Sequence, residues 1–453
     1  MEPYRLHVYV CDQRKPEGAP CCSARGSVRV IEVLRREIAA AGLGDDVQVT
    51  TCGSLGLCER GPNMVVYPEA VWYSGVQVED VSTIVQEHFK GGRVVDRLLN
   101  RDPAVLRKEI ADNKKKMLAA LAANDAAGAL PDDFQQAVRG FQSSRVLLTA
   151  IELDVFTAVG QGTRSDDIAV TLATDRRATE MLLDALVALN VLRKQGGVYS
   201  NTPLSGRYLV VGARDDARAA LKHSAHLWPR WSTLTDCVRQ GTSMTYQEMV
   251  DRGDEWTTAF IAAMHRNATA RAPLVVNATG LDGVRRMLDV GGGSGAYAIA
   301  FARAIRDLRV EVFDLPTVLP IAQGHIDEAG LSDRITTHSG DLRTDDLGSG
   351  FDLILLSAIC HMLGPVANQD LLGRCFAALA PGGRVLVQDF ILEPDRTSPR
   401  FAALFALNML VGTSEGSTYT SEEYRSWLNQ VGFVDIQHVA LPGPTGLMLG
   451  RHP

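Results

Sequence analysis

Over the last third of the chain, segments whose apolar residues have the spacing of a β-strand alternate with segments whose apolar residues have the spacing of an α-helix. The stretches that predict strands are RMLDVGGG, RVEVFD, ITTHSG, FDLILLS, GRVLVQDF and a final strand near Gly446–Gly450. The segments between these strands have apolar residues at helical spacing and predict helices. Strands that alternate with helices predict a doubly wound, mainly parallel sheet. We therefore expect a Rossmann-like α/β domain over residues 272–453.

The middle of the chain has mostly helical spacing. FQQAVRGFQSSRVLLTAIELDVFTAV and TEMLLDALVALNVL repeat apolar residues at helical intervals, and GGVYSNTP then predicts a small β-wing. Two helices and a wing predict a winged-helix-like domain over residues 130–271, an arrangement that binds DNA in other proteins. The segment is not notably basic, so we expect it to serve dimerisation or substrate enclosure.

The first hundred residues have a second α/β pattern. Strands are predicted at residues 7–11, 47–51 and 63–68, and helices at residues 28–41 and 78–89. Residues 101–129 are rich in alanine and lysine and predict a solvated helical linker. Its triple lysine, Lys114–Lys116, is expected to be an exposed face of that helix.

Length and charge narrow the class of protein. A chain of 453 residues is too long for one ordinary core, which agrees with the domains proposed above. A net charge of -7 disfavours nucleic acid and anionic membranes as partners. No apolar run of about 18 residues predicts a membrane span. These features favour a cytoplasmic protein.

Cysteines are concentrated near the start of the chain. Five of the eight lie in the first 58 residues, at positions 11, 21, 22, 52 and 58. In a reducing compartment a dense cysteine cluster more often binds metal than forms disulfides. Thiolates suit zinc or an iron–sulfur cluster, and their spacing does not separate the two.

The residues around these cysteines carry a more specific signal. HVYVCDQRKPEGAPCCSARGS and LGLCERGPNMVVYPEAVWYSGVQVEDVSTIVQEHF resemble the thioredoxin-like 2Fe–2S ferredoxins over most of residues 5–99. The resemblance implies a thioredoxin-like ferredoxin domain at residues 1–100 with a 2Fe–2S cluster for electron transfer or redox sensing. The ligands that we expect are Cys11, Cys22, Cys52 and Cys58.

One ligand position departs from that family. In the ferredoxin family the last two cluster ligands are spaced C-x3-C. In this chain Ser54 occupies the position of the first of these two cysteines. We expect the loop to bring in Cys52 instead, with Ser54 or Cys21 as the alternatives. A domain that has lost its cluster and serves in docking is the remaining reading.

A glycine loop follows the first strand of the C-terminal domain. DVGGGSG (289–295) lets a nucleoside lie close to the backbone, where a Cβ would collide. Asp314 ends the next strand and can accept hydrogen bonds from ribose hydroxyls. With Ala296 the loop also fits the dinucleotide pattern G-x-G-x-x-A, so these residues alone do not choose the cofactor.

The rest of the chain favours one cofactor. SGDLRTDD, FDLILLSAICHML, LAPGGRVLVQDFIL and YTSEEYRSWLNQVGF resemble the plant-like and acetylserotonin-type O-methyltransferases, and residues from about 130 resemble their dimerisation domain. The resemblance implies a homodimeric S-adenosylmethionine-dependent methyltransferase acting on a small molecule. The implied cofactor contacts are Asp289, Gly291, Gly293 and Asp314. Asp341 and Leu342 are implied to flank the adenine, and Ser357 to lie near the methionine end.

The same resemblance implies that His361, in SAICHML, removes the proton of the methyl acceptor. The alternative is a histidine that only caps the loop. Relatives often have aspartate after the histidine and a glutamate in a later loop. Here Met362 and Thr418 occupy these positions, although Glu415 is near. With supporting carboxylates absent or displaced, we expect a thiol or hydrosulfide acceptor rather than a hydroxyl, because thiols ionise more readily.

Two rival functions use the same residues. In one, the cluster delivers electrons and S-adenosylmethionine binds as a charged structural element without methyl transfer. In the other, the chain is a redox-responsive binding protein without turnover. Release of S-adenosylhomocysteine distinguishes methyl transfer from both.

Overall fold

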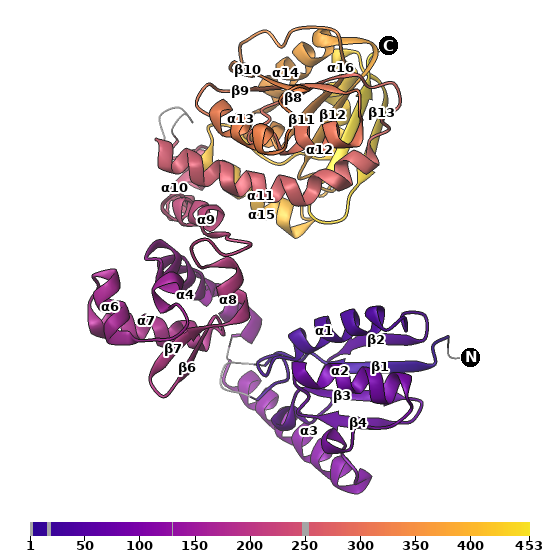
Figure 1. Cartoon of the computed structure of the whole chain (residues 1–453), viewed down its shortest axis with the longest axis vertical. Helices are drawn as coiled ribbons and strands as arrows, with labels where there is room; N and C mark the ends of the chain where they lie inside the picture. Colours follow the sequence, from indigo (N-terminus) through magenta and orange to yellow (C-terminus); the bar gives the residue numbers. More distant parts are fainter. Residues whose placement is uncertain (1–2, 16–19, 129, 247–252) are drawn as a thin grey trace. The chain divides into compact units, whose positions relative to one another are not determined.

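The computed structural model describes residues 3–15, 20–128, 130–246 and 253–453 (Figure 1). Its contacts divide the chain into two compact units, Met1–Gly140 and Phe141–Pro453. Each unit has hydrophobic cores of its own. No helix in the described ranges is long and apolar enough to cross a membrane.

The first unit contains a four-stranded sheet in the order β2-β1-β3-β4. β1 pairs in parallel with β2, while β1–β3 and β3–β4 are antiparallel. The elements are β1 (Leu6–Cys11), α1 (Ser27–Ala40), β2 (Val47–Cys52), β3 (Asn63–Tyr67) and β4 (Val71–Ser74). Apolar residues from one face of the sheet and from α1 form one core. The sequence predicted these elements except β4, which is only four residues long.

The second helix of this unit is irregular. It runs through a 3-10 turn (Val78–Asp80), α2 (Val81–Thr83) and a π-helical stretch (Ile84–Lys90). Short 3-10 turns also form at Cys58–Arg60 and Asp96–Leu98. The sequence predicted a single regular helix here.

The predicted linker forms the long helix α3 (Pro103–Ala126). Its first half packs on the loop between β2 and Cys58. Asn113 Nδ2 donates a hydrogen bond to Gly56 O at 2.8 Å, Ile110 lies against Gly56, and Glu109 pairs with Arg60. Lys114–Lys116 are exposed, as expected. α3 is therefore attached to the cysteine-bearing loop.

Helices and a small antiparallel sheet occupy the middle of the chain. The sheet has the order β5-β7-β6, and β6–β7 is the predicted wing. The elements are α4 (Asp132–Glu152), α5 (Val155–Val159), β5 (Thr163–Arg164), α6 (Ser165–Leu172), α7 (Arg176–Ala188), β6 (Leu192–Gln195), β7 (Val198–Asn201), α8 (Pro203–Tyr208), α9 (Arg218–Trp231), α10 (Leu234–Gln240) and α11 (Asp254–Ala278). One buried cluster joins α5, α6, α7 and β7.

The last part of the chain forms a seven-stranded sheet in the order β10-β9-β8-β11-β12-β14-β13. β8 to β12 are parallel, and β14 is antiparallel to both of its neighbours. The elements are β8 (Arg286–Val290), α12 (Ala296–Ala304), β9 (Arg309–Asp314), α13 (Leu319–Glu328), β10 (Ile335–Ser339), β11 (Phe351–Ser357), α14 (Pro365–Ala378), β12 (Leu379–Asp389), α15 (Arg400–Gly412), α16 (Ser421–Val431), β13 (Val434–Ala440) and β14 (Gly446–Arg451).

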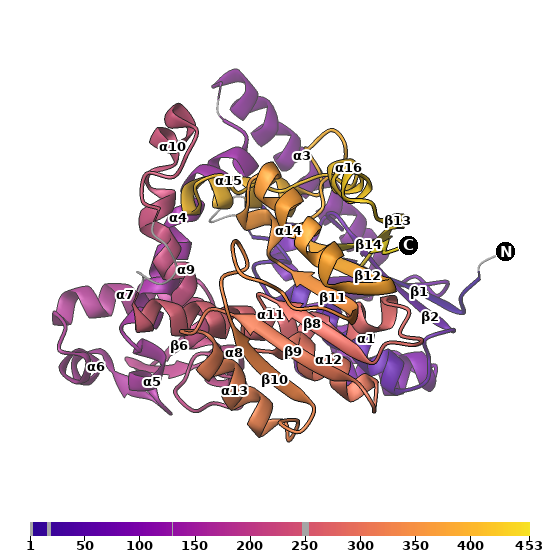
Figure 2. The same ribbon diagram turned by 90° about the horizontal axis from the view of Figure 1, so that it is seen from above.

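Helices cover both faces of this sheet (Figure 2). α11, α12 and α13 pack on one face, and α14 and α16 on the other. The central strand β11 reads FDLILLS and is buried on both sides, which explains its continuous apolar run. β13 was missed because its side chains are mostly exposed and show no apolar alternation.

The order of the strands locates the functional region. From β8 the chain moves outward to β9 and β10, and from β11 it moves the opposite way to β12. In open α/β sheets ligands bind beyond the carboxyl ends of the strands where this direction reverses. The loops after β8 and β11 meet at that point.

Candidate active site

The glycine loop between β8 and α12 lies at the reversal point. Gly291 and Gly293 both have left-handed backbones, with φ of 66° and 57°. A Cβ on Gly291 would collide with Ile359, whereas a Cβ on Gly293 would meet nothing within 4 Å. Gly291 therefore lets the loops after β8 and β11 pack closely. Gly293 borders open space, which is where a ligand can approach the backbone.

Asp314, at the end of β9, is hydrogen-bonded to the glycine loop. Gly293 N–H donates to its Oδ2 at 2.8 Å, and Leu315 N–H donates to its Oδ1 at 2.7 Å. Burial raises the pKa of this carboxyl. Each carboxylate oxygen can accept a further hydrogen bond. Asp314 is thus positioned to hold the loop and to accept a ligand hydroxyl.

Asp289, the last but one residue of β8, is completely buried below the same loop. Neither of its carboxyl oxygens has a hydrogen-bond partner among the described residues. Burial, with the nearby charge of Asp314 as a smaller contribution, raises its pKa to about 7. A buried carboxyl without a partner is costly, so a cationic ligand group beside it would be stabilised.

The other predicted cofactor residues lie on neighbouring loops. Leu342 lies beside the glycine loop, with Cδ2 3.5 Å from where a Cβ on Gly291 would be. Asp341 pairs with Arg343 at 2.8 Å, and the hydrogen bonds from Arg343 lower its pKa. Ser357 Oγ donates to Gln388 Oε1 at 2.7 Å. Asp341 and Leu342 follow β10, and Ser357 is the last residue of β11, so all three lie at the carboxyl ends of parallel strands.

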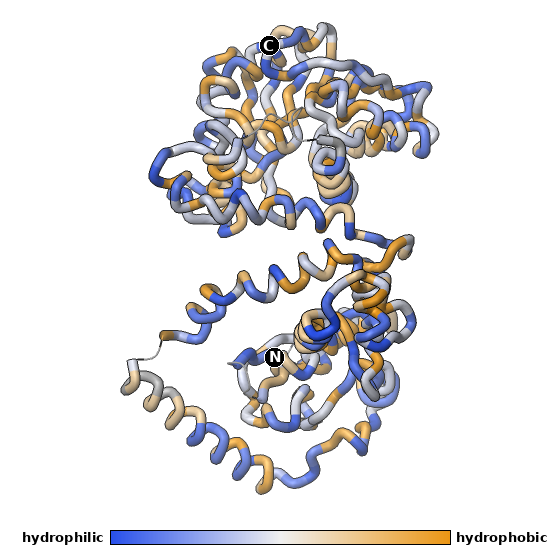
Figure 3. Tube along the Cα trace, turned by 90° about the vertical axis from the view of Figure 1, so that its left-hand side faces the viewer, coloured by the Kyte–Doolittle hydropathy of each residue, from blue (hydrophilic) through white to orange (hydrophobic). Residues whose placement is uncertain are grey.

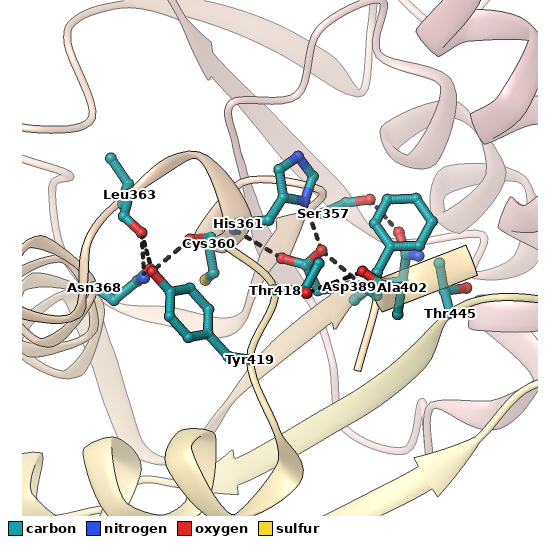
Figure 4. A network of polar contacts seen from close by, with 12 residues as sticks. Ser357, Cys360, His361, Leu363, Asn368, Asp389, Ala402, Thr418, Tyr419 and Thr445 are labelled. Carbon is teal, nitrogen blue, oxygen red and sulfur yellow. Dashed lines mark hydrogen bonds and ion pairs between the residues drawn. The ribbon is translucent and has the colours of Figure 1, made fainter. Parts of the chain in front are cut away.

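His361 lies on a short 3-10 turn (Cys360–Met362) after β11 and is 6% exposed. Its Nδ1 is 2.6 Å from Asp389 Oδ1, and its backbone N–H donates to Asp389 Oδ2 at 3.1 Å (Figure 4). An ionised carboxylate only accepts hydrogen bonds, so this pairing assigns the ring proton to Nδ1. Nε2 is left with a lone pair and has no hydrogen-bond partner in the described part of the chain.

Asp389 is itself held in place by further donors. Tyr424 OH donates to its Oδ2 at 3.1 Å and Phe390 N–H donates to its Oδ1 at 2.8 Å. Tyr424 is fully buried, and burial raises its pKa well above the ordinary value, so it remains a donor. Four hydrogen bonds therefore fix the carboxylate that orients His361.

The supporting carboxylates were expected to be absent or displaced, and the structure shows a displaced one, because Asp389 pairs with His361. Thr418 Oγ1 donates instead to Ala402 O at 3.1 Å, and Glu415 lies against Gly364. The loop at residues 415–420 reaches His361 only through its backbone, with Ser417 N–H donating to His361 O at 2.9 Å. The supporting carboxylate comes from the end of β12. Ser357 pairs with Gln388 across β11 and β12, which places the following Asp389 beside the histidine loop.

Aromatic side chains surround the exposed side of this pair. The His361 ring is 5.0 Å from Phe405 and 5.8 Å from Phe390, measured between ring centroids. Phe401 continues the cluster toward solvent, 5.9 Å from Phe405, and is half exposed. These rings form an apolar wall on which a planar acceptor can stack.

The sequence did not indicate a contribution from α11. His265 Nδ1 is 2.9 Å from Ser294 Oγ in the glycine loop, and its ring stacks on His325 at 4.0 Å. A single histidine on a helix of mixed polarity carries no recognisable signal. Tyr297 was missed for a similar reason, although its OH donates to Gln388 Oε1 at 3.0 Å.

Three of the four predicted cluster cysteines lie together in the first unit. Cys11, Cys22 and Cys58 lie close enough to perturb one another, so that the neighbouring thiols raise the pKa of Cys22 and lower that of Cys58. Cys52 lies across from Cys11 on the paired strand, and burial raises its pKa to about 11. Among the residues that the structure describes, no group of three or more His, Cys, Asp or Glu side chains is placed to hold a metal ion. The sulfurs are therefore neighbours without forming a complete metal site.

The alternative ligands are placed differently. Ser54 Oγ is 3.4 Å from Cys58 Sγ. Cys21 is buried and accepts a hydrogen bond from Ala24 N–H at 3.4 Å. Ser54 thus lies next to one of the clustered thiols, while Cys21 bonds to its own turn.

The C-terminal sheet, its glycine loop and a histidine at the reversal point fit the class of Rossmann-like methyltransferases that use S-adenosylmethionine. Comparison with known proteins is more specific. The O-methyltransferase domain family matches residues 231–434, and the O-methyltransferase dimerisation domain matches residues 135–211. The chain belongs to the O-methyltransferase family.

Individual relatives agree with this assignment. The chain is 34% identical to 3-hydroxy-5-methyl-1-naphthoate 3-O-methyltransferase of Streptomyces sahachiroi, over 69% of this chain and 92% of that protein. It is 32% identical to acetylserotonin O-methyltransferase of Bos taurus, over 69% and 95%. The structure of human N-acetylserotonin methyltransferase with S-adenosylmethionine matches with a TM-score of 0.63 and 28% identity, over 70% of this chain and 96% of that one.

These relatives do not support the expected preference for a thiol. All three are named for oxygen methylation or for an acetylserotonin acceptor, and none is named for sulfur. The preference also depended on a missing carboxylate, and Asp389 provides one.

Proposed function

We propose that this chain methylates a hydroxyl group on an aromatic small molecule and that His361 is the general base. The observation that carries the proposal is the buried His361–Asp389 pair, in which Nδ1 contacts the carboxylate and Nε2 has no partner among the described residues, beside an aromatic wall. The first relative acts on a hydroxynaphthoate, which is an acceptor of this chemical type.

Each residue of the site would have a separate role in the proposed methyl transfer. S-adenosylmethionine, when bound, supplies the methyl group. His361 Nε2 accepts the hydroxyl proton, and Asp389 stabilises the imidazolium that results. Phe390 and Phe405 hold the acceptor ring so that its oxygen approaches in line with the methyl group. A phenol has a pKa of about 10, so removing its proton at neutral pH requires such a base.

Methyl transfer to 2-naphthol tests the role of His361, with His338→Ala as the control because His338 lies on β10 outside this cluster. We expect His361→Ala to lower kcat by about 10²–10⁴-fold, the range for a lost general base. Asp389→Asn should also lower kcat, because the amide cannot stabilise the charged ring.

A nitrophenol that is already ionised at neutral pH separates base catalysis from a structural role. A lost base should matter much less for this acceptor than for 2-naphthol. Equal losses on both acceptors would show that His361 only shapes the site. Naphthalenethiol as a faster acceptor than 2-naphthol would restore the thiol reading.

For the cofactor, we propose that Gly291, Gly293, Asp289, Asp314, Asp341, Leu342 and Ser357 form the S-adenosylmethionine site. The open space at Gly293 and the unpartnered carboxyl of Asp289 support this assignment. A cationic ligand suits a buried carboxyl better than an anionic dinucleotide would.

We also propose that residues 1–100 form a thioredoxin-like domain that binds a 2Fe–2S cluster for electron transfer or redox sensing. The parallel β1–β2 pair followed by an antiparallel hairpin, in the order β2-β1-β3-β4, fits that fold. The mutual contacts of Cys11, Cys22 and Cys58 support these three as ligands. Cys52, opposite Cys11, is the proposed fourth, and a redox partner follows if the cluster transfers electrons.

The remaining proposals concern the whole chain. We propose four segments: the ferredoxin-like domain at residues 1–100, the linker at 101–129, the dimerisation domain at 130–271 and the catalytic domain at 272–453. The enzyme is proposed to be a cytoplasmic homodimer. Eight free cysteines suit a reducing compartment, and the dimerisation domain supports the homodimer.

A further inference from the structure

Arg230, in the last turn of α9, has an unusual environment for an arginine. Its guanidinium is half-buried, lies 5.5 Å from the centre of the Trp256 ring and faces Gly412 at the end of α15. A Cβ on Gly412 would be 3.6 Å from Nη1. In the described ranges the guanidinium has neither a hydrogen bond nor a carboxylate partner. Burial without a compensating acid lowers its pKa.

Other arginines nearby do have acidic partners. Arg145 lies 5.6 Å from the centre of the Trp228 ring but also pairs with Glu152. Arg218, the most buried arginine with ion pairs here, binds both Asp154 and Asp216. Stacking on Trp256 is worth about 0.5–2 kcal/mol and leaves the five N–H donors of Arg230 unused. Arg230 is therefore a half-buried cation whose charge no carboxylate of the described residues compensates.

One helix, α15, contacts both Arg230 and His361. Phe401, Phe405, Asn408 and Gly412 are spaced so that they lie along one face of the helix. Phe405 on this face contacts the His361 ring, and Gly412 contacts Arg230. Seven residues of helix separate the two contacts by about 10 Å. Trp231 Nε1 donates to Asn408 Oδ1 at 3.0 Å, which fixes α9 against this face.

We propose that Arg230 binds a carboxylate of the methyl acceptor, so that the acceptor is a hydroxylated aromatic acid. Its hydroxyl lies at His361, its rings pack along Phe405, and its carboxylate forms a bidentate pair with the guanidinium. The inference rests on the proposed function and adds the substrate class. It also explains why a half-buried arginine stands at the end of an aromatic wall.

Two acceptors that differ only in charge test the inference: 6-hydroxy-2-naphthoate and its neutral carboxamide. Each has its hydroxyl and its carboxyl-derived group at opposite ends of a flat skeleton. We expect wild type to have the higher kcat/KM on the acid. Arg230→Met should lower kcat/KM on the acid by about 10- to 100-fold, the range for a hydrogen bond to a charged group, and change the amide little. Arg145→Met is the matched control and should leave the ratio of acid to amide unchanged.

The possible results separate this inference from the proposed function. Equal kcat/KM for acid and amide in wild type, or equal losses in Arg230→Met, would overturn the carboxylate role alone, provided that the amide is methylated with dependence on His361. Methylation of neither acceptor, with no binding of either in calorimetry, would overturn both. If Arg230→Met does not fold, Arg230→Lys replaces it as the test. This variant keeps a positive charge, so it should keep part of the preference in kcat/KM for the acid over the amide, and an unchanged preference or its complete loss would contradict the bidentate pair.

Discussion

Two buried carboxylates, at the ends of the strands β8 and β12 on either side of β11, have opposite environments. Asp389 accepts four hydrogen bonds, two from His361 and one each from Phe390 and Tyr424. Asp289 accepts none from the described residues, and its pKa is raised to about 7. The first carboxylate is a fixed charge that orients a base. The second is a group whose charge depends on what binds beside it.

The raised pKa of Asp289 predicts a specific dependence of stability on pH. In the unfolded chain its pKa is about 3.9, so the folded protein holds this proton more tightly. The resulting stabilisation is complete below pH 4 and is lost as the pH rises through 7. We expect Asp289→Asn, which cannot ionise, to gain about 2–3 kcal/mol of unfolding free energy relative to wild type between pH 5 and pH 8. Urea unfolding at the two pH values measures this.

Cofactor binding gives a second readout for Asp289. A cation beside the carboxyl favours its ionised form, so binding of S-adenosylmethionine at pH 6 should release a proton. Calorimetry in buffers of different ionisation enthalpy detects that release, which should vanish in Asp289→Asn. Asp333→Asn neutralises an exposed carboxyl and should retain it. Proton release that persists in Asp289→Asn would mean that the cation lies elsewhere.

Gly293 predicts a local effect on cofactor binding. Because its Cβ would point into open space, Gly293→Val should block the ligand without disturbing the core. Gly330, in the turn after α13, has the same left-handed backbone and equally open surroundings, with φ of 68°. Gly330→Val carries the same backbone strain outside the site and serves as the control. We expect only Gly293→Val to abolish S-adenosylhomocysteine binding in calorimetry, and equal binding by the two variants would refute the placement.

At the scale of elements, the loop from Cys52 to Cys58 has two attachments. β2 and Cys58 bring it to the clustered thiols, and α3 holds its middle through Ile110 and Asn113. Asn63, buried on β3, donates to Cys22 Sγ at 3.3 Å and to Leu57 O at 2.7 Å. The cysteine-bearing loops are therefore tied together by hydrogen bonds of the protein itself.

This arrangement predicts which cysteine completes the cluster. In anaerobically reconstituted protein, Cys52→Ala should lose most of its iron and sulfide, because Cys52 lies opposite Cys11. Cys21→Ala should retain both, since Cys21 bonds to its own turn. Iron and sulfide analysis with visible absorption measures the outcome. Bound zinc without sulfide in the wild type would exclude the cluster, and full retention by Cys52→Ala would favour Ser54 as the fourth ligand.

At the scale of the whole molecule, one apolar surface stands out. Phe134, Val138 and Phe141 follow one another along α4 at helical spacing and are 55%, 59% and 57% exposed. Figure 3 shows hydrophobic and hydrophilic positions mixed along the helical parts of the tube. Such a stripe in a dimerisation domain is expected to be covered by a second copy of the chain.

The stripe predicts the effect of a single charge on assembly. In a twofold dimer each substitution occurs twice, so Val138→Asp should weaken association by at least about 10²-fold. Val170→Asp is the control, because Val170 on α6 is 70% exposed but outside the stripe. Sedimentation over a range of concentrations measures the dimer fraction. A wild type that remains monomeric, or a Val138→Asp variant that dimerises normally, would contradict the assignment.

The sequence by itself predicted the alternating strands and helices of the C-terminal sheet, the glycine loop, His361 and the clustering of cysteines. These features are encoded by local periodicity and by residues close together in the chain. The tertiary structure decided which distant groups meet: Asp389 with His361, Arg230 with Gly412, and Ile359 with Gly291. It also decided that Gly293, rather than Gly291, borders open space. Such contacts depend on strand order and helix packing, which join residues far apart in sequence and leave no periodic signal in it.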